Sequence, residues 1–579
     1  MDWLDWNDDA FARARERHAP VLLFIKASWC RWCRELEERI LSAPAVRTAL
    51  ERDFVTILVD KDRRPDIDPR YTRGGWPTLA WLDEHGEVLG ADNFLEEPQL
   101  LERLGQIAEA YSGGPERVRA ALGEADETPT PPPRPSKAAL GKPTAPLSLE
   151  IVEKITQSVL DTADPVHGGW GKQHKFPHPE AIDFALVRWS QTGDAALLDL
   201  VRRTLRRMQE GEIHDRVEGG FYRYATRADW SVPNTEKMLD SNAQRLFVYL
   251  EGYQATGDEE LRRTAIAGLE WMHERLRDGA THAFKGSQDA DEEYARLGTR
   301  EARARRGAPP CDTTVFTNWN AMAVSTLLKA SVVLGDRVWR DRALETLEFL
   351  LAEMWDAEHG MHHYWDGKPH LAGMLSDQAY TLRALVDAAQ FAGENRFLAT
   401  AEKLASLTIE GLRSDTGAFY DKPHDPAARG GLRQRNRSIL ENSVMAEALL
   451  RLALLTGQRD YEDSAREALA SFTTDYRRYG HFVAGYARAV DLFFHQPVVV
   501  TVVGPGEAEA TRELALAALR PFVASRIVRI VDPQRDPELF ERSGLPEPGQ
   551  GARAYVERGR ESYAETDDPA KLPALMTRT

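Results

Sequence analysis

The sequence predicts a multidomain protein with three structured parts: an N-terminal α/β domain, an (α/α)6 toroid of helical hairpins and a small C-terminal α/β unit. Three observations lead to this prediction. A Cys-x-x-Cys motif stands between an apolar strand and a helix near the N-terminus. Five similar glycine turns recur along the middle of the chain, and one β-α-β pattern follows them. At 579 residues the chain is too long for a single hydrophobic core, so several domains are expected.

Residues 1–122 show the order of a thioredoxin domain. The apolar strand VLLFIKA at 21–27 leads into SWCRWCRELEERIL, and a second strand, FVTILVD, follows at 54–60. The turn GGWPT then precedes a third strand, LAWLD, and a helical start at 10–17 and a closing helix from Pro98 complete the pattern. The βα setting makes the CxxC motif more specific than the motif alone.

Cys30 and Cys33 are the candidate catalytic residues of this domain, together with Pro77. Cys30 is expected at the end of a strand and Cys33 in the first helical turn, where unpaired N–H groups stabilise a thiolate. Cys30 is therefore predicted to be the attacking thiolate and Cys33 the resolving thiol. Pro77 belongs to the turn expected to face the cysteines, and the bond from Trp76 can adopt the cis form at low cost.

Two other interpretations of the CxxC motif stay open: half of a zinc site, and a remnant of the fold without redox activity. The zinc site lacks a second cysteine pair, because Cys311 stands alone, so no metal is predicted. The acid that thioredoxins typically bury in the strand before the motif is absent, and Phe24 and Lys26 lie there instead.

Residues 123–147 are predicted to be a linker. The stretch EADETPTPPPRPSKAALGKPTAP within it contains seven prolines, which prevent a helix and favour an extended spacer. The linker marks a domain boundary.

An internal repeat of helical hairpins is predicted at 148–496. Its turns are QTGDAAL, ATGDEEL, VLGDRVW, FAGENRF and LTGQRDY, with glycines at 193, 257, 335, 393 and 457. Glycine permits the left-handed conformation that ends a helix, and Asp or Glu after it can cap the next one. Twelve helices are expected, beginning near Leu149, Pro179, Ala195, Glu236, Glu259, Trp319, Arg337, Leu375, Asn395, Leu440, Arg459 and Phe482.

The two sets of helices differ in character. Those before the glycine turns are small and apolar, as in AMAVSTLLKASVV, whereas those after them are charged and amphipathic. This difference predicts an inner and an outer ring, and six hairpins that close on themselves form an (α/α)6 toroid. An open superhelical solenoid is the alternative, which would usually show a more regular period.

Residues 497–579 are predicted to form the small α/β unit, from the strand PVVVTVV, the helix EATRELALAALRPF and the strand RIVRIVD. The loop GPGE lacks the GxGxxG spacing of a nucleotide site, so no cofactor is predicted and the unit is expected to pack on the barrel.

The composition argues against several functions. A net charge of −17 disfavours nucleic-acid binding, because phosphate contacts need a clustered Lys/Arg surface. No stretch approaches about 20 consecutive apolar residues, so no membrane span is expected, and the charged N-terminus lacks the apolar core of a secretory signal. Three cysteines in so long a chain suit a reducing compartment, and a cytoplasmic location is expected.

A ligand pocket is predicted at the end of the toroid opposite the glycine turns. Long loops rich in aromatic, basic and amide residues gather there, above all the stretch 219–244, and the positive ends of the inner helices converge on it. The candidate ligand-binding residues are His174, Lys175, Arg223, Tyr224, Trp230, Glu236, Lys237, Asp240, Asn242, Asp289, Asp291, Trp319, Asn320, Asp377 and Glu441.

Paired carboxylates within this set suggest general acid–base chemistry. Glu236 and Asp240 are expected four residues apart on one helix face, and Asp289 and Asp291 lie in the loop SQDAD. The structural alternative is that Glu236 caps its helix and that the two loop aspartates pair with arginines. The histidines of the segment 359–363 are interpreted as surface residues rather than metal ligands.

The motifs of the chain resemble those of thioredoxin-domain proteins of the YyaL and spermatogenesis-associated-protein-20 type, which carry the DUF255 domain. The resemblance rests on WCRWC, FVTILVDKDRRPDIDPRY, GGWPT, HKFP, GGFYRY, WSVPNTEKMLDSNA, SQDAD and TNWNAM, which span most of the chain in order. It implies a DsbH-like thioredoxin domain with a redox-active centre, joined to a six-hairpin toroid similar to N-acylglucosamine 2-epimerases and glycosidases of carbohydrate metabolism.

Three positions depart from the family pattern. Arg31 and Arg34 stand where histidines usually follow the cysteines, and Asn234 replaces a histidine that is a candidate acid/base. A cysteine pair near the C-terminus is absent from 554–563.

The predicted function is a thiol-disulfide reductase that acts on a protein disulfide, coupled to a barrel that binds a sugar-like or polyhydroxylated ligand. Two alternatives are a carbohydrate-active epimerase or glycosidase-like enzyme with the thioredoxin domain as a scaffold, and a non-catalytic binding protein.

Overall fold

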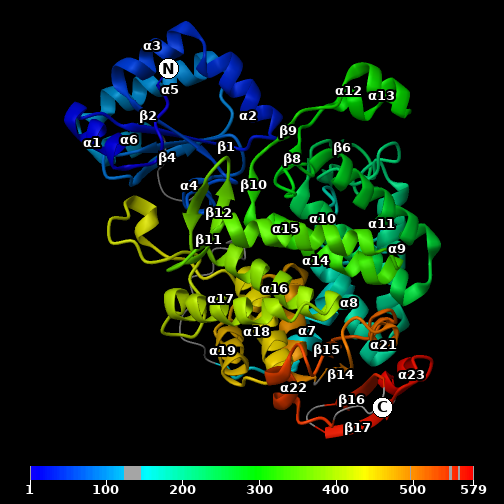
Figure 1. The fold of residues 1–579 in the computed structure, drawn as a ribbon. Coiled ribbons are helices and arrows are strands. Elements are labelled where there is room, and N and C mark those ends of the chain that lie inside the picture. Colours follow the sequence, from blue (N-terminus) through cyan, green and yellow to red (C-terminus); the bar gives the residue numbers. More distant parts are fainter. Residues whose placement is uncertain (1, 123–144, 496, 547–550, 559–560, 578–579) are drawn as a thin grey trace. The chain divides into compact units, whose positions relative to one another are not determined.

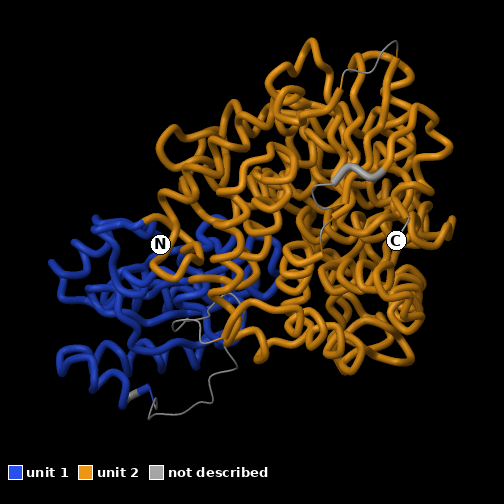
Figure 2. The backbone as a smooth tube through the Cα atoms, turned by 90° about the horizontal axis from the view of Figure 1, so that it is seen from below, with its two compact units in different colours: residues 1–137, 424–436 blue, residues 138–423, 437–579 orange. Residues whose placement is uncertain are grey.

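The computed structural model describes residues 2–122, 145–495, 497–546, 551–558 and 561–577 (Figure 1). Most of the predicted linker, residues 123–147, lies outside these ranges. The chain divides into two compact units (Figure 2). They comprise residues 1–137 with 424–436, and residues 138–423 with 437–579.

The first unit contains the predicted α/β domain. Its four-stranded sheet has the order β2-β1-β3-β4, with β1 parallel to β2 and antiparallel to β3. The strands are β1 (Val21–Lys26), β2 (Val55–Asp60), β3 (Thr78–Leu82) and β4 (Val88–Asp92). The helices are α1 (Asp8–Arg17), α2 (Arg31–Glu35), which continues as a π-helix at Leu36–Leu41, α3 (Pro44–Asp53), α4 (Asp68–Tyr71), α5 (Glu97–Tyr111) and α6 (Pro115–Ala121).

Both faces of this sheet are buried. Successive side chains of a strand point to opposite faces, so each strand contributes to two cores. Leu22 and Phe24 pack in one core cluster, whereas Leu23 and Ile25 pack in the other. The three predicted strands are confirmed, while β4 and α3 were not predicted.

Segment 424–436 is a correction to the predicted barrel range. Its Leu432 is buried in a core of the first unit, and the backbone N–H of Gly431 donates to the Tyr71 hydroxyl at 2.8 Å. Gly430 has φ +48, and a Cβ there would lie 2.0 Å from the carbonyl oxygen of Gly86. Only glycine fits this approach, so a loop that is polar in sequence becomes part of the first unit.

Among the described residues of the second unit, twelve helices form two rings, as predicted. The inner helices are α8 (Pro179–Thr192), α10 (Leu239–Thr256), α14 (Thr317–Leu334), α16 (Leu375–Ala392), α18 (Ile439–Thr456) and α20 (Ala484–Phe494). The outer helices are α7 (Glu150–Thr162), α9 (Ala195–Glu210), α11 (Glu259–Trp271), α15 (Arg337–Glu353), α17 (Arg396–Leu412) and α19 (Asp460–Ala470).

The inner ring is closed. Each inner helix contacts the next one along the chain, and α20 returns to contact α8. This closure confirms the (α/α)6 toroid over an open solenoid. The five turn glycines all end inner helices in the left-handed conformation, with φ from 68° at Gly257 to 79° at Gly457.

Short strands and helices fill the connections that precede the inner helices. They are β5 (Tyr224–Ala225), β6 (Pro233–Asn234), β7 (Lys237–Met238), a π-helix at Met272–Leu276, β8 (Ser287–Gln288), α12 (Glu292–Ala295), α13 (Arg300–Arg306), β9 (Cys311–Asp312), β10 (Val315–Phe316), β11 (Trp355–Asp356), β12 (Gly360–Trp365) and β13 (Pro369–Ala372). Short 3-10 helices lie at Gly430–Arg433, Tyr476–Arg478 and Gly480–Val483.

The C-terminal part is a four-stranded sheet with the order β15-β14-β16-β17. Its elements are β14 (Val498–Val503), α21 (Glu509–Leu519), β15 (Ile527–Val531), α22 (Pro537–Ser543), β16 (Arg553–Arg558), β17 (Glu561–Thr566) and α23 (Leu572–Met576). The predicted parallel β14-α21-β15 unit is confirmed, and β16 and β17 add an antiparallel pair.

This sheet packs on the barrel, at the end where the glycine turns lie. Strand β15 contacts α16 and α18, and α21 contacts α14. The Arg529 side chain donates to the Leu454 carbonyl oxygen at 2.9 Å, and the Asn395 amide donates to the Ile530 carbonyl oxygen at 2.7 Å. In the described part of the chain, no helix has the length and apolar character needed to cross a membrane.

Candidate functional site

The two cysteines of the first unit lie at the start of α2. Cys30 precedes the helix with extended backbone, and its Sγ accepts a hydrogen bond from the Cys33 N–H at 3.3 Å. The Trp76–Pro77 peptide bond is cis, and the Trp76 carbonyl oxygen lies 3.9 Å from the Cys30 sulfur. The proline turn therefore faces the cysteines, as predicted.

The two thiols differ in exposure, and the pKa of Cys33 is raised. Cys30 is 8% exposed and Cys33 is 1% exposed, so an incoming disulfide reaches Cys30 first. A hydrogen bond with the Cys30 side chain, together with burial, raises the pKa of the Cys33 thiol. Cys33 thus holds its proton while Cys30 is the group placed to attack.

The charge of Asp60 also acts on Cys33 and adds to this rise in pKa. Asp60 is the last residue of β2 and pairs in register with Lys26 of β1. Its carboxylate accepts hydrogen bonds from the Asp62 N–H at 2.8 Å and the Arg63 N–H at 3.3 Å. An acid on the strand beside the one that precedes the motif therefore acts electrostatically on Cys33.

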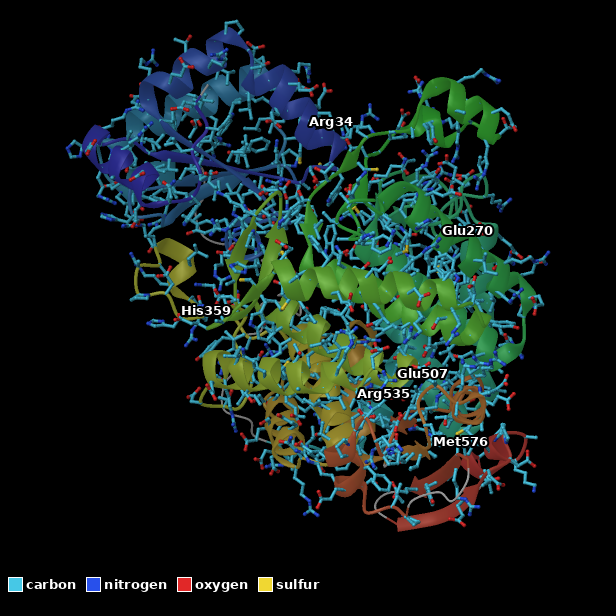
Figure 3. All side chains as sticks on the ribbon, in the orientation of Figure 1. Arg34, Glu270, His359, Glu507, Arg535 and Met576 are labelled. Atoms are coloured by element: carbon cyan, nitrogen blue, oxygen red, sulfur yellow. The ribbon has the colours of Figure 1, made fainter. Side chains whose placement is uncertain are left out.

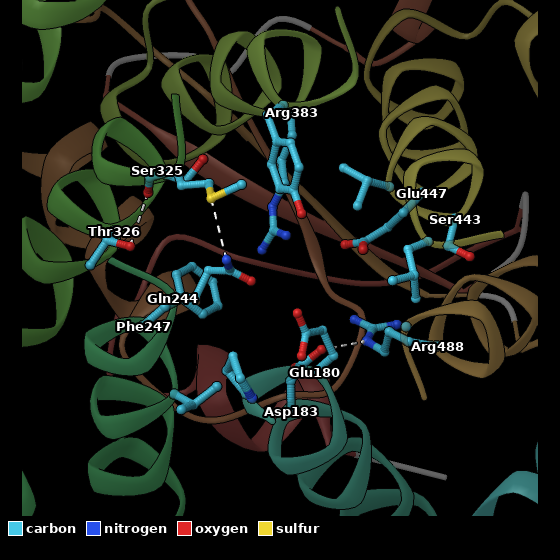
Figure 4. Close-up of a pocket in the computed structure, with 17 residues that line it drawn as sticks. Glu180, Asp183, Gln244, Phe247, Ser325, Thr326, Arg383, Ser443, Glu447 and Arg488 are labelled. Carbon is cyan, nitrogen blue, oxygen red and sulfur yellow. Dashed lines mark hydrogen bonds and ion pairs between the residues drawn. The ribbon is translucent and has the colours of Figure 1, made fainter. Parts of the chain in front are cut away.

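The barrel contains a cavity of about 150 Å³ on its axis, lined by residues from all six inner helices. This volume can hold several ordered waters or a small ligand. Figure 4 shows five charged side chains around it, with the Arg383 guanidinium pointing inward. They are Glu180, Asp183, Arg383, Glu447 and Arg488.

Donors and acceptors alternate around this axial cavity. Arg488 lies 3.5 Å from Asp183, and Arg383 reaches Asp387 only at 4.0 Å. In the described structure, neither Glu180 nor Glu447 forms an ion pair within 4 Å or a side-chain hydrogen bond. Ser325, which is 3% exposed and lines the cavity, also has a hydroxyl without a hydrogen-bond partner among these residues. Polar groups buried in this way are costly unless they meet water or a ligand.

The carboxyl groups of the cavity have shifted pKa values in opposite directions. Burial raises the pKa of Glu180. Burial and the charge of nearby Glu251 raise the pKa of Asp183 to about 8. Burial opposes the ionisation of Glu447 as well, but the Arg383 and Arg488 guanidiniums hold the pKa of this carboxyl below its usual value. A protonated and an ionised carboxyl therefore face the same space at neutral pH.

None of the ligand-binding residues predicted from the sequence lines this axial cavity. Two of them, Asp240 and Glu441, lie near it, since their charges act on Tyr380, which lines the cavity. The sequence does carry a signal for the missed residues: single charged side chains interrupt inner helices that are otherwise apolar, as in PEAIDFAL, AYTLRAL and GYARAV.

Lys175 and Lys237 occupy equivalent structural positions in successive hairpins. Lys175 is buried and donates to Asp164 at 2.8 Å and to the Gly168 carbonyl oxygen at 2.7 Å. Lys237 is likewise buried, pairs with Asp215 and donates to the Gly219 carbonyl oxygen at 2.8 Å. Each lysine thus fastens a loop rather than facing the axial cavity.

Asn242 and Asn320 clamp the loops that precede their helices. The Asn242 side chain accepts from the Phe221 N–H at 2.7 Å and donates to the carbonyl oxygens of Phe221 and Met238 at 2.9 Å. Asn320 makes the equivalent three bonds to Phe284 and Phe316.

Glu236 differs from its prediction. Helix α10 begins at Leu239, so Glu236 precedes the helix and does not share a helix face with Asp240. It does not cap the helix either, because the cap residue Met238 makes no side-chain cap bond. Instead, Glu236 is 5% exposed and pairs with Arg223 at 3.2 Å, and burial raises its pKa.

The aromatic candidates pack against protein groups. Tyr224 stacks on Phe176 with ring centroids 4.5 Å apart, and His174 meets the Tyr224 ring edge-on at 6.0 Å. Trp230 is fully buried and donates to the His167 carbonyl oxygen at 2.9 Å. Trp319 is 9% exposed and lies 4.4 Å from the Phe316 ring centre.

Asp377 pairs with a histidine that was expected at the surface. His363 is 2% exposed, and its Nδ1 lies 2.8 Å from an Asp377 carboxylate oxygen, so the surface interpretation is wrong for this residue. The other Asp377 oxygen accepts from the Asn318 N–H at 3.1 Å. Asp377 lies in the first turn of α16, and strand β12 brings His363 to it.

The loop aspartates take up different roles. Asp291 caps α12 by accepting from the Tyr294 N–H and pairs with Arg306 at 3.0 Å, as the structural alternative predicted. Asp289 donates its backbone N–H to the Pro310 carbonyl oxygen at 2.9 Å, and its charge acts on Cys311. No group of three His, Cys, Asp or Glu side chains among the described residues is arranged to hold a metal ion.

Comparison with known proteins agrees with this arrangement of domains. Residues 1–126 match the family Thioredox_DsbH, described as a protein of unknown function, DUF255. Spermatogenesis-associated protein 20 of Homo sapiens is 24% identical, with 100% of this chain aligned to 90% of that protein. The disulfide bond reductase DsbH of Chlamydia pneumoniae is 25% identical over 105 residues, covering 16% of this chain and 63% of DsbH.

Solved structures resemble the helical part. Cellobiose 2-epimerase from Spirochaeta thermophila is 15% identical, with a TM-score of 0.46, and the match covers 56% of this chain and 82% of the epimerase. The chain is thus a protein similar along its whole length to spermatogenesis-associated protein 20, with a DsbH-type thioredoxin-like domain followed by an (α/α)6 barrel.

Proposed function

We propose that the first unit is a thiol-disulfide reductase that acts on protein disulfides in a reducing, cytoplasmic compartment. The observation that carries this proposal is the geometry of the CxxC motif: Cys30 is the more exposed sulfur, accepts the Cys33 N–H at 3.3 Å and faces the proline turn. The similarity of this region to a disulfide bond reductase supports the same chemistry.

The reaction balances as a two-electron exchange. The Cys30 thiolate attacks one sulfur of the substrate disulfide, forming a mixed disulfide and releasing the first substrate thiolate. Cys33 then loses its proton and attacks the Cys30 sulfur, which releases the second substrate thiol and leaves a Cys30–Cys33 disulfide. An external dithiol must reduce this disulfide before the next cycle.

Reduction of insulin disulfides in the presence of dithiothreitol tests the proposal. We expect Cys30→Ser to abolish the rate above the uncatalysed background and Cys33→Ser to trap a mixed disulfide that reducing agent releases. Cys311→Ser, a matched change in the second unit, should leave the rate unchanged. Equal rates for wild type and Cys30→Ser would reject the proposal.

We also propose that the barrel binds a sugar-like or polyhydroxylated ligand in its axial cavity. The alternation of guanidinium, carboxyl, amide and hydroxyl groups around the cavity favours this class, since each ligand hydroxyl can both donate and accept. Arg383 and Glu447 are the expected principal contacts, because neither forms a hydrogen bond to a side chain or backbone group among the described residues.

Calorimetry with a panel of monosaccharides, disaccharides and linear polyols tests this second proposal. Arg383→Gln and Glu447→Gln should each weaken binding by about tenfold or more, whereas Glu270→Gln on the outer helix α11 should not. Absence of binding by the wild type to every member would contradict it.

The two alternatives make different predictions for the same panel. Turnover of a bound sugar that survives loss of both Cys30 and Cys33 would favour a carbohydrate-active enzyme with a thioredoxin scaffold. Binding without turnover, in a protein that does not reduce insulin, would favour a non-catalytic binding protein.

A further inference from the structure

A second cavity, of about 530 Å³, lies in the second unit between the glycine-turn end of the barrel and the C-terminal sheet. One wall comes from the turn at Gly335, the start of α15 and the end of α16. The other wall comes from the loop before α21 and from α21 itself. It is separate from the axial cavity, with which it shares no lining residue.

The charged side chains that line this second cavity, called the cleft below, are mainly positive, whereas the chain as a whole is negative. Among the described residues, five arginines but only two glutamates line it, in a protein whose net charge is −17. The arginines are Arg337, Arg340, Arg512, Arg520 and Arg535, and the glutamates are Glu394 and Glu507.

Three of these arginines have carboxylate partners. Arg340 pairs with Glu394 at 2.5 Å, and Arg512 pairs with Glu509 at 3.3 Å. Arg535 pairs with Glu507 at 3.2 Å, and Figure 3 labels both residues at the edge of the C-terminal part.

The other two, Arg337 and Arg520, form no side-chain hydrogen bond or ion pair in the described part of the chain. They contribute two positive charges that no described group neutralises by direct contact.

Two glycines lie beside guanidinium groups of this cleft. A Cβ at Gly335 would stand 3.3 Å from Arg520 Nη2, and one at Gly506 would stand 3.4 Å from Arg535 Nη1. Gly335 also has φ +72, a conformation that other residues rarely adopt.

The start of α21 borders the same cleft. Its cap residue is Ala508, which has no side chain able to cap the helix, so first-turn N–H groups lack a capping acceptor. Thr511 in that first turn lines the cleft, is 1% exposed, and has a buried hydroxyl without a described hydrogen-bond partner. This helix start is compatible with an oxyanion.

The Asp532 carboxylate already binds a backbone N–H of the loop before α21. It accepts the Gly506 N–H at 2.8 Å, so this glycine does not offer its amide to a phosphate. The loop therefore does not act as a nucleotide-binding glycine loop, and recognition of an anion falls to the arginines.

We propose that this cleft binds a small ligand that carries a phosphate or pyrophosphate group, held chiefly by Arg337 and Arg520. Guanidinium forks match phosphate oxygens in charge and geometry, and two uncompensated arginines suit a dianion. The 530 Å³ volume leaves room for an organic part beside the phosphate.

Isothermal titration calorimetry of the full chain at low ionic strength tests this, with pyrophosphate, inorganic phosphate, glucose 6-phosphate and glucose as probes. Pyrophosphate should bind, with an affinity that falls as salt is added. Glucose 6-phosphate binding more tightly than inorganic phosphate would identify a phosphate ester as the ligand, and equal binding would identify phosphate alone. Glucose should not compete with pyrophosphate.

The double variant Arg337→Gln/Arg520→Gln should weaken pyrophosphate binding by about tenfold or more. Arg202→Gln/Arg305→Gln removes the same charge from two exposed arginines elsewhere and should keep wild-type affinity. The single variants Arg337→Gln and Arg520→Gln give a second and milder test, and each should weaken binding severalfold. No binding by the wild type, or equal losses in the two double variants, would overturn the proposal.

Discussion

A few charged residues on the inner helices give the axial cavity its polar lining. The inner ring is apolar along most of its length, yet Glu180, Asp183, Arg383, Glu447 and Arg488 all reach its axis. Their carboxyl groups do not behave alike, because burial favours the neutral form of Asp183 while the adjacent guanidiniums favour the ionised form of Glu447.

The raised pKa of Asp183 predicts a dependence of stability on pH. Folded Asp183 keeps its proton up to about pH 8, whereas unfolded Asp183 loses it near the ordinary value of 3.8. Between these values the native state binds more protons than the unfolded state, so this group makes stability fall as pH rises. The slope is at most about 1.4 kcal/mol per pH unit.

Denaturant unfolding at pH 5 and pH 8 measures the effect. Asp183→Asn should lose less stability between these values than the wild type does, whatever constant cost follows from its contact with Arg488. Asp199→Asn, the same change at an exposed position on α9, should retain the wild-type slope. Parallel curves for wild type and Asp183→Asn would contradict the assignment.

At the scale of elements, a repeated amide clamp ties four of the inner helices to the segments that precede them. Asn242, Asn320, Gln378 and Asn442 lie in the first turns of α10, α14, α16 and α18. Each side chain accepts one loop N–H and donates to two carbonyl oxygens, as Asn442 does with Phe419 and Ser438. The clamp satisfies backbone groups in the segments that precede these helices.

Loss of one clamp should destabilise the barrel measurably. Asn442→Ala leaves the buried Phe419 N–H and two carbonyl oxygens without this partner, at a cost of about 1–3 kcal/mol for each group that stays unpaired. We expect a lower denaturant midpoint for the second unit. Gln157→Ala, at an exposed amide on α7 that bonds only to Asp161 among the described residues, should change stability by less than about 0.5 kcal/mol. Equal midpoints for the two variants would show that the clamp contributes little.

At the scale of the whole molecule, each unit is completed by a segment distant in sequence. The first unit takes in 424–436, whose Leu432 enters its core. The second unit closes when α20 meets α8, and the C-terminal sheet then packs across the ends of α14, α16 and α18. Each of these contacts joins residues separated by dozens to hundreds of positions.

The sequence alone was sufficient for the elements that local rules govern. Glycine turns, apolar periodicity and the strand–CxxC–helix order depend on nearest neighbours, and they predicted twelve helices, the closed toroid, the dithiol and the β14-α21-β15 unit. Strands β4, β16 and β17 were missed, because short strands take their stability from pairing with distant partners rather than from their own residues.

Only the tertiary structure shows which side chains line the axial cavity. Lys175, Lys237 and Asn242 looked like ligand contacts. A sequence does not show that a buried lysine is paired with an aspartate, or that a side-chain amide is bonded to the backbone. The charges that do face the axial cavity come from four inner helices, α8, α16, α18 and α20, and meet only when the ring closes. Ring closure also sets the different pKa values of Asp183 and Glu447, because burial and neighbouring charge exist only in the folded chain.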